Sequence, residues 1–267
     1  MILIRGGGDL ASGVALRLAR VGLRVLITEL PQPLAVRRLV SFAQVVYDDE
    51  MAIEGVHAHL AANLDDAVAW MERGQVTVLV DPDGSAISAC RPLVLMDARM
   101  RKRPPDTGLD AAPLVIGLGP GFTAGLDCHA VIETRRGPFL GRVIWDGPAE
   151  ADTGLPDPIA QRQGERVLRA PAAGIFTADK NIGDTLSVGQ QIAEVAGQPI
   201  RAPFPGMLRG LLQSGTPVSR GVKVGDIDPR LDPRLPGLVS DKALAVGGGA
   251  LEAILTCAEI RRRLWEE

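Results

Sequence analysis

The feature that most constrains this fold is an internal repeat in the C-terminal half of the chain. Residues 169–195 and 201–227 carry one pattern at an offset of 32 positions. RAPAAG, which begins at Arg169, recurs as RAPFPG from Arg201, and GQQIAEV recurs as GVKVGDI. Each copy of a fixed-period repeat is one structural unit. Two short β-rich copies predict a small sandwich with a pseudo-two-fold axis.

The repeat resembles the lipoyl/biotinyl carrier domains, which have a barrel-sandwich hybrid fold. In those carriers, the turn between the halves holds a lysine that is lipoylated or biotinylated. Here residues 196–199 read AGQP, and the lysines of the module, Lys180 and Lys223, lie away from that turn. The resemblance therefore implies the carrier fold without the carrier chemistry.

Composition limits the partners that we expect. The net charge is −3 and aromatic residues make up 3% of the chain, which disfavours a nucleic-acid partner. The three cysteines are scattered and odd in number, which indicates a reducing compartment. No apolar stretch approaches the ~18 residues that span a bilayer, and the chain opens directly on a strand and a glycine turn, not on a signal peptide. We expect a cytoplasmic protein without a membrane partner.

The first 30 residues follow the order strand, glycine turn, helix, strand, acid. This order matches the dinucleotide fingerprint G-x-G-x-x-A at Gly6, Gly8 and Ala11. Glu29 follows the second strand, close to the ~20 residues after the glycines at which an acid is expected. The pattern predicts a Rossmann-like domain in an α/β protein.

Each position of the fingerprint has a physical role. Gly6 permits the tight turn, Gly8 lets backbone amides approach a pyrophosphate, and Ala11 lets the helix pack closely. The helix N-terminus adds partial positive charge. Glu29 can accept hydrogen bonds from a ribose and would repel a 2′-phosphate, which favours NAD over NADP. The candidate cofactor-binding residues of this turn are Gly6, Gly7, Gly8, Asp9, Leu10, Ala11 and Glu29.

Asp9 has two interpretations of equal weight. A carboxylate in a phosphate turn opposes a pyrophosphate unless a metal or a basic side chain intervenes. Alternatively, Asp9 caps the helix and is structural. Glycine turns of this kind also occur in domains that bind no ligand.

A second glycine-rich loop follows an apolar strand at residues 114–116. Its consecutive amides predict an anion-binding nest, to which a threonine adds a hydroxyl. The alternative is a tight corner between β elements. The candidate residues are Gly117, Gly119, Gly121 and Thr123.

Other segments complete the α/β alternation. Arg37 and Arg38 belong to an expected helix, where they meet an anion or form a solvated face. Gly247–Gly249 either precede a helix N-terminus as a third anion site or let that helix pack tightly. The acids between Asp226 and Asp232 form either a metal-like cluster or a solvated linker. Helices are expected at 33–40, 63–72 and 249–264, and strands at 76–80, 92–96, 131–137 and 140–147.

Nearly the whole chain resembles a bacterial family named for selenium-dependent molybdenum hydroxylase systems. The signatures are IRGGGDLASG from Ile4, VIGLGPGFTAGLD from Val115 and LAVGGGALEAI from Leu244. The first half is also similar to accessory proteins that mature xanthine dehydrogenase. The resemblance implies a maturation or cofactor-handling role for a client molybdenum hydroxylase. Together with the glycine turn, it makes NAD or a molybdopterin dinucleotide the expected ligand. It leaves a homo-oligomer open.

We divide the chain into four parts. Residues 1–105 are expected to form the Rossmann-like nucleotide-binding domain, and residues 106–166 a glycine-loop β segment. Residues 167–230 form the lipoyl/biotinyl-like sandwich. Residues 231–267 form a linker and a C-terminal helix that packs back on the N-terminal domain.

Two other functions remain open. An NAD-dependent oxidoreductase acting on a small substrate needs an acid or base, for which Asp97, Lys102, His129 and Glu133 are candidates. A non-catalytic docking module would use the sandwich to recognise a client enzyme. No catalytic set or metal-ligand spacing is found in the sequence, so we assign no catalytic or metal-binding residue and leave open whether the protein is an enzyme.

Overall fold

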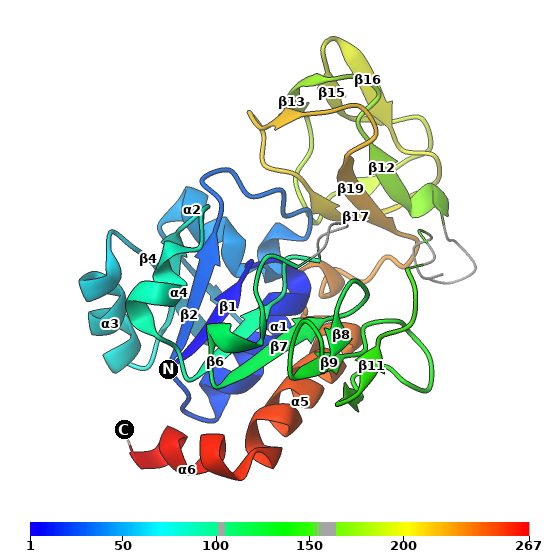
Figure 1. Cartoon of the computed structure of the whole chain (residues 1–267). Helices are drawn as coiled ribbons and strands as arrows, with labels where there is room; N and C mark the ends of the chain where they lie inside the picture. The colour runs from blue at the N-terminus through cyan, green and yellow to red at the C-terminus, as the bar shows by residue number, and fades with distance from the viewer. Residues whose placement is uncertain (101–104, 153, 155–163, 267) are drawn as a thin grey trace. The chain divides into compact units, whose positions relative to one another are not determined.

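The computed structural model describes residues 1–100, 105–152, 154 and 164–266. The chain divides into two compact units (Figure 1). Unit 1 comprises Met1–Pro33, Ser41–Asp152 and Val239–Glu267, and unit 2 comprises Leu34–Val40 and Thr153–Leu238.

Unit 1 is built on one large sheet, which contains nine strands within the described residues. Its seven inner strands are parallel, and an antiparallel strand closes each edge. Most of the inner strands are short apolar runs, as expected for strands covered on both faces, whereas β4 contains two histidines. In sheet order the strands are β10 (Val143–Ile144), β9 (Ala130–Ile132), β7 (Leu114–Leu118), β6 (Val94–Asp97), β1 (Ile2–Arg5), β2 (Val25–Glu29), β5 (Val76–Val80), β4 (Val56–Ala61) and β3 (Glu50–Ile53).

Helices cover both faces of this sheet. One core cluster joins Leu3 and Val131 to α3 (Leu64–Glu72) and α4 (Ser85–Cys90). The opposite face carries α1 and α5, because α5 approaches Ile132, the strand neighbour of Val131. The bounds of the remaining helices of unit 1 are α1 (Asp9–Arg20), α2 (Val45–Asp48), α5 (Asp241–Thr256), α6 (Ala258–Glu266), η2 (Phe42–Gln44) and η3 (Leu109–Ala111).

Glycines allow α5 to lie directly against α1 (Figure 1). A Cβ atom added at Gly247 would lie 2.6 Å from the carbonyl oxygen of Gly13, and one at Gly249 would overlap the carbonyl oxygen of Gly141. The helix begins well before them, where the Ser240 hydroxyl accepts a hydrogen bond from the Ala243 amide. The interpretation of Gly247–Gly249 as an anion site at a helix N-terminus is therefore wrong.

The expected helix at 33–40 is also wrong. Residues 34–40 belong to unit 2 and contain only the 3-10 turn η1 (Arg38–Val40). The Arg37 guanidinium is buried and donates to the Leu238 carbonyl at 2.8 Å, and Arg38 Nε donates to the Leu211 carbonyl at 2.7 Å. These arginines bond to backbone carbonyls, so neither forms the solvated helix face that was expected.

The segment that we set apart at 106–166 is divided differently. Its strands β7, β9 and β10 belong to the same sheet as β1. Two further strands, β8 (Thr123–Ala124) and β11 (Gly147–Pro148), form a separate antiparallel pair. The large mixed sheet with helices on both faces confirms the predicted α/β class.

Unit 2 contains two four-stranded sheets within the described residues. The strand orders are β12-β19-β17-β14 and β16-β15-β13-β18. Strands β13–β15 belong to the first copy of the repeat and β17–β19 to the second, and β12 and β16 are the corresponding strands that lead into each copy. The bounds are β12 (Val167–Arg169), β13 (Gly174–Ala178), β14 (Thr185–Leu186), β15 (Gln191–Val195), β16 (Gln198–Arg201), β17 (Gly206–Leu211), β18 (Pro217–Val218) and β19 (Lys223–Asp228).

The two copies of the repeat interlock. Short strand β14 of the first copy pairs with β17 of the second, and β18 of the second pairs with β13 of the first. The turn between the copies is a two-residue hairpin, in which Ala196 has φ 51° and Gly197 has φ 72°. Positive φ at both positions matches the twist of flanking strands.

Within the described residues, no single helix is long and apolar enough to cross a membrane. One pair of helical segments, Leu235–Thr256 and Ala258–Leu264, reaches the required length and composition only when both are taken together, and the chain bends sharply between them.

Candidate functional site

The strand order of unit 1 brings Asp97 and Gly117, two candidate site residues, together at the carboxyl ends of neighbouring strands. Arg5, at the end of β1, lies beside Asp97 at the end of β6, and Asp97 lies beside Gly117 of β7. On the other side, Arg5 lies beside Thr28 of β2. The chain order reverses between β1 and β6, and ligands of such sheets bind at the carboxyl ends of the strands at this point.

The glycine turn after β1 has the geometry that its sequence predicts. Gly6 has φ 90°, and its amide donates to the Thr28 carbonyl at 2.8 Å. Helix α1 begins at Asp9, with Gly8 as its N-cap residue. A Cβ added at Gly8 would meet no atom within 4 Å, so this position is open.

Gly7 is enclosed, in contrast to Gly8. A Cβ at Gly7 would lie 2.8 Å from the Ala43 nitrogen. The Gly7 carbonyl accepts from the Ala43 amide at 2.9 Å and from the Ser12 hydroxyl at 3.1 Å, and that hydroxyl accepts from the Phe42 amide. One side of the turn is therefore fixed by the segment that begins η2.

Glu29 bonds to the turn itself. Its carboxylate accepts from the Gly7 amide at 3.1 Å and from the Leu30 amide at 2.9 Å. Burial raises the pKa of Glu29 above its usual range, and the two amide hydrogen bonds oppose this shift. The expected ribose acceptor therefore also holds the glycine turn in place.

The other residues of the fingerprint lie in the first turn of α1. Asp9 is the first helical residue and Gly8 is the N-cap, so Asp9 is not the N-cap residue of this helix. Its carboxylate instead lies where the helix dipole favours negative charge. Leu10 and Ala11 are buried, and Ala11 is 1% exposed.

An ion-pair cluster that the sequence did not predict lies beside the turn. The Arg99 guanidinium bonds to both oxygens of Asp97, at 3.0 and 2.5 Å, and to both oxygens of Asp106. Arg5 donates to Asp106 at 2.7 Å. Arg99 also approaches the position that a Gly6 Cβ would take. The run of cations after Asp97 was the signal for this cluster.

The second glycine loop forms a corner of the fold. A Cβ at Gly117 would overlap the ring of Phe122. The Gly119 amide donates to the Ile132 carbonyl at 2.9 Å, and the Thr123 amide donates to Asp127 Oδ2 at 2.9 Å. Gly121 has φ 103°. Two of the amides expected to form an anion nest, those of Gly119 and Thr123, are thus bonded within the protein.

The acid and base candidates are separated or already bonded. The amide of Val115, two residues before Gly117 on β7, donates to His129 Nδ1 at 2.9 Å. The buried Glu133 carboxylate accepts from two backbone amides. Asp97 is paired with Arg99. Lys102 lies outside the described residues.

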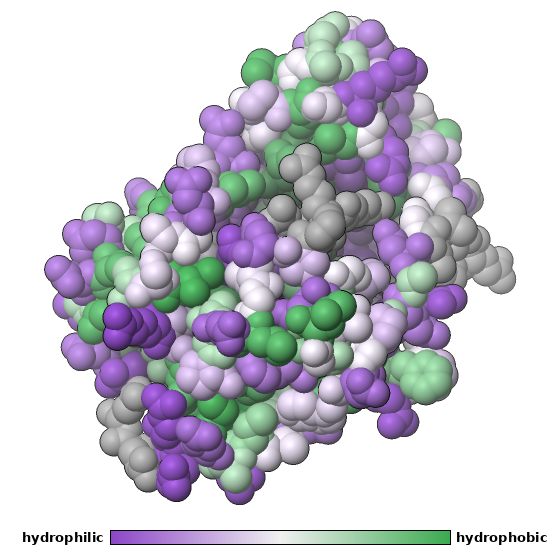
Figure 2. Space-filling view, viewed as in Figure 1, coloured by the Kyte–Doolittle hydropathy of each residue, from purple (hydrophilic) through white to green (hydrophobic). Residues whose placement is uncertain are grey.

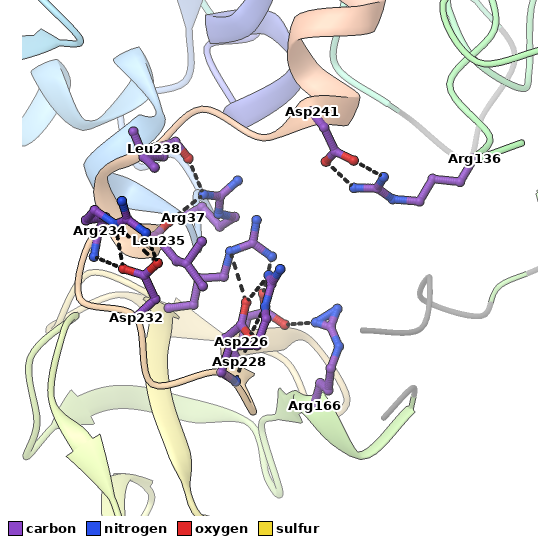
Figure 3. A network of polar contacts seen from close by, with 12 residues as sticks. Arg37, Arg136, Arg166, Asp226, Asp228, Asp232, Arg234, Leu235, Leu238 and Asp241 are labelled. Carbon is purple, nitrogen blue, oxygen red and sulfur yellow. Dashed lines mark hydrogen bonds and ion pairs between the residues drawn. The ribbon is translucent and has the colours of Figure 1, made fainter. Parts of the chain in front are cut away.

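The acids at the end of the repeat form ion pairs in unit 2 (Figure 3). Asp226, buried, pairs with Arg166 at 2.8 Å. Asp228 is fully buried and pairs with Arg230 at 2.7 Å. Burial favours a higher pKa for Asp228, but the bonds from Arg230 outweigh it and lower the pKa. No metal-binding group of three or more His, Cys, Asp or Glu is found in the described part of the chain.

Comparison with known proteins gives one extensive match in sequence. Uncharacterized protein YqeB of Escherichia coli (strain K12) is 49% identical over 255 residues, which cover 96% of this chain and 47% of YqeB. The chain thus spans about half the length of this curated relative. No family model matches.

Similarity to solved structures is weak. An aspartoacylase family protein from Mesorhizobium loti gives a TM-score of 0.23 at 20% identity, over 25% of this chain and 24% of that chain. The apo structure of the ectoine utilization protein EutE (DoeB) from Ruegeria pomeroyi gives 0.25 at 10% identity, over 85% of each chain. Scores this low support no argument about fold or function.

Proposed function

We propose that unit 1 is a Rossmann-like domain whose glycine turn binds the pyrophosphate of a dinucleotide, either NAD or a molybdopterin dinucleotide. The observation that carries this proposal is the open Gly8 position at the N-terminus of α1, at the edge where the strand order reverses. Helix N-termini supply unpaired amides and partial positive charge to an anion. Six of the seven parallel strands, β5-β2-β1-β6-β7-β9, follow the 3-2-1-4-5-6 order of dinucleotide-binding domains, and the seventh, β4, is added outside β5.

The residues present fit such a ligand on one side of the turn. Gly8 leaves the space that a pyrophosphate needs, whereas Gly7 is covered. Glu29 retains acceptor capacity for a ribose beyond the two amides that it binds. Its carboxylate would repel a 2′-phosphate, so NAD is favoured over NADP.

The resemblance to molybdenum hydroxylase accessory proteins gives this site its proposed role. We infer that the chain handles a cofactor for a client molybdenum hydroxylase in the cytoplasm. Unit 2 would be a lipoyl/biotinyl-like platform that contacts the client, since its Ala196-Gly197 turn offers no carrier lysine. A redox reaction is less favoured, because Asp97 is paired with Arg99, and Glu133 and His129 Nδ1 already accept hydrogen bonds from backbone amides.

Calorimetric titration of the full chain with NAD, NADP and a molybdopterin dinucleotide tests the ligand. Gly8→Val fills the open position and should weaken binding by at least about tenfold, or ~1.4 kcal/mol. Gly237→Val is the matched control, because Gly237 is an equally open glycine in unit 2. Absence of binding, or equal binding by both variants, would refute the proposal.

The role in maturation needs its own test. Co-purification of the chain with a molybdenum hydroxylase, lost when residues 167–228 are deleted, would support the platform. Full cofactor loading of the hydroxylase in cells that lack the chain would contradict it.

A further inference from the structure

A cavity of about 1180 Å³ lies in unit 1, on the face of the sheet that carries α4. Its walls come from α4, η3 and the loops that precede β6, β7 and β9. Residues 6–11 do not line it, so this space is distinct from the glycine turn. A cavity of this size is large enough for a small-molecule ligand.

Arg5 supplies the buried charge of the cavity wall. Its side chain is 7% exposed, and Nη1 donates to Asp106 at 2.7 Å. A Cβ added at Gly84 would lie 2.9 Å from Arg5 Nη2, so the glycine leaves room for this part of the guanidinium. A guanidinium presents five donors in a planar fork that matches a carboxylate or a phosphate.

Thr107 supplies an unsatisfied group in the same wall. Its hydroxyl oxygen is buried and has no hydrogen-bond partner among the described residues. Buried hydroxyls are nearly always paired, so an unpaired one requires an explanation such as an absent ligand. This observation is independent of the charge of Arg5.

The carboxylates of the wall do not give the cavity a net negative charge. Three aspartates, Asp83, Asp106 and Asp110, are matched by three arginines, Arg5, Arg91 and Arg263. Asp106 pairs with Nη1 of Arg5, whereas Nη2 lies beside Gly84. Between the polar groups, Ile87 and other apolar residues line the cavity. The wall therefore combines a buried cation and a hydroxyl with an apolar surface.

We propose that this cavity is a second binding site, which takes a small molecule bearing a carboxylate or phosphate group. The oxyanion accepts hydrogen bonds from Arg5 and Thr107, and the apolar part of the molecule lies against Ile87.

NMR titration of the full chain with succinate, and separately with inorganic phosphate, tests the site. Saturable shifts of the Thr107 and Gly108 amides are expected, and the tighter probe identifies the oxyanion. Thr107→Val and Arg5→Lys should each weaken binding by at least about tenfold. Thr185→Val, at an exposed threonine of unit 2, should change nothing.

Thermal unfolding separates binding from a structural role. Thr107→Val removes an unpaired buried hydroxyl, so the unliganded variant should unfold at the same temperature as the wild type or higher. A lower unfolding temperature, no shifts up to ~10 mM probe, or unchanged affinity in Thr107→Val would overturn the proposal. If Gly8→Val loses NAD binding but still binds the probe, the cavity and the glycine turn are separate binding sites, and the two proposals can be judged independently.

Discussion

Arg99 joins two acids that lie at the sheet edge beside the glycine turn. It bonds to Asp97, whose side chain is 3% exposed, and to the more exposed Asp106. Removal of one partner leaves a buried carboxylate without its countercharge, which costs far more than loss of a surface pair. We expect Arg99→Met to lower the free energy of unfolding by about 3 kcal/mol.

Urea unfolding at pH 7 measures this loss. Arg234→Met is the matched control, because the Arg234–Asp232 pair is exposed to solvent. The control should unfold at the wild-type urea concentration. A similar loss in both variants would mean that burial of Asp97 does not decide the effect.

Glu29 should make stability depend on pH. Burial raises its pKa in the folded state, so the folded protein binds this proton more tightly than the unfolded chain. The favourable contribution is complete below about pH 4.5 and is lost as the pH rises through the folded value. The wild type should therefore lose stability relative to Glu29→Gln between pH 4.5 and neutrality. Denaturant titrations across this range measure the difference, and parallel curves would contradict the assignment.

The glycine turn was predicted from the sequence, but the residues that bond to it and lie beside it were not. The roles of Gly6 and Gly8 depend on local backbone geometry, which the fingerprint specifies. The bond from Gly7 to Glu29 and the pairing of Arg5 with Asp106 depend on which strands are neighbours. No local pattern contains that information, and periodicity could not predict the cluster around Arg99.

At the scale of elements, α5 offers a direct test of helix packing. Gly249→Ala places a methyl group against the Gly141 carbonyl and should destabilise the protein by about 1–3 kcal/mol. Gly248→Ala adds the same methyl where no atom lies within 4 Å, and should stabilise the helix by about 0.5–1 kcal/mol. Thermal unfolding compares the two, and effects of equal sign would contradict the packing argument.

Elements with strong local signals were predicted closely. The apolar run at 76–80 is β5, and Asn63 caps α3 by accepting from the Asp66 amide. The segment at 33–40 was predicted wrongly because its apolar residues suit a helix face. Its conformation is instead set by β17, where the Leu211 amide bonds to the Val36 carbonyl. That strand lies more than 170 positions away.

At the scale of the molecule, residues 34–40 make unit 2 depend on the N-terminal part of the chain. Arg38 anchors the segment through the Leu211 carbonyl and the Gln213 side chain. Arg38→Gln should therefore speed hydrogen exchange at Leu211, by about five- to tenfold for a loss of ~1–1.5 kcal/mol. Exchange in α1 should stay unchanged.

Exchange mass spectrometry of peptides from β17 and α1 measures both effects. Arg220→Gln is the control, because Arg220 is exposed in the same unit. Faster exchange in α1 as well would show that the variant unfolds the whole protein and not the local contact.

The interlocked short strands of unit 2 have a consequence for its origin. A chain with a single copy of the repeat would have β14 but no β17 to receive it, and β13 but no β18. Such a chain could complete its sheets only by exchanging strands with a second molecule. Duplication of the repeat within one gene would place both copies in one chain. The sandwich could then form without a second molecule.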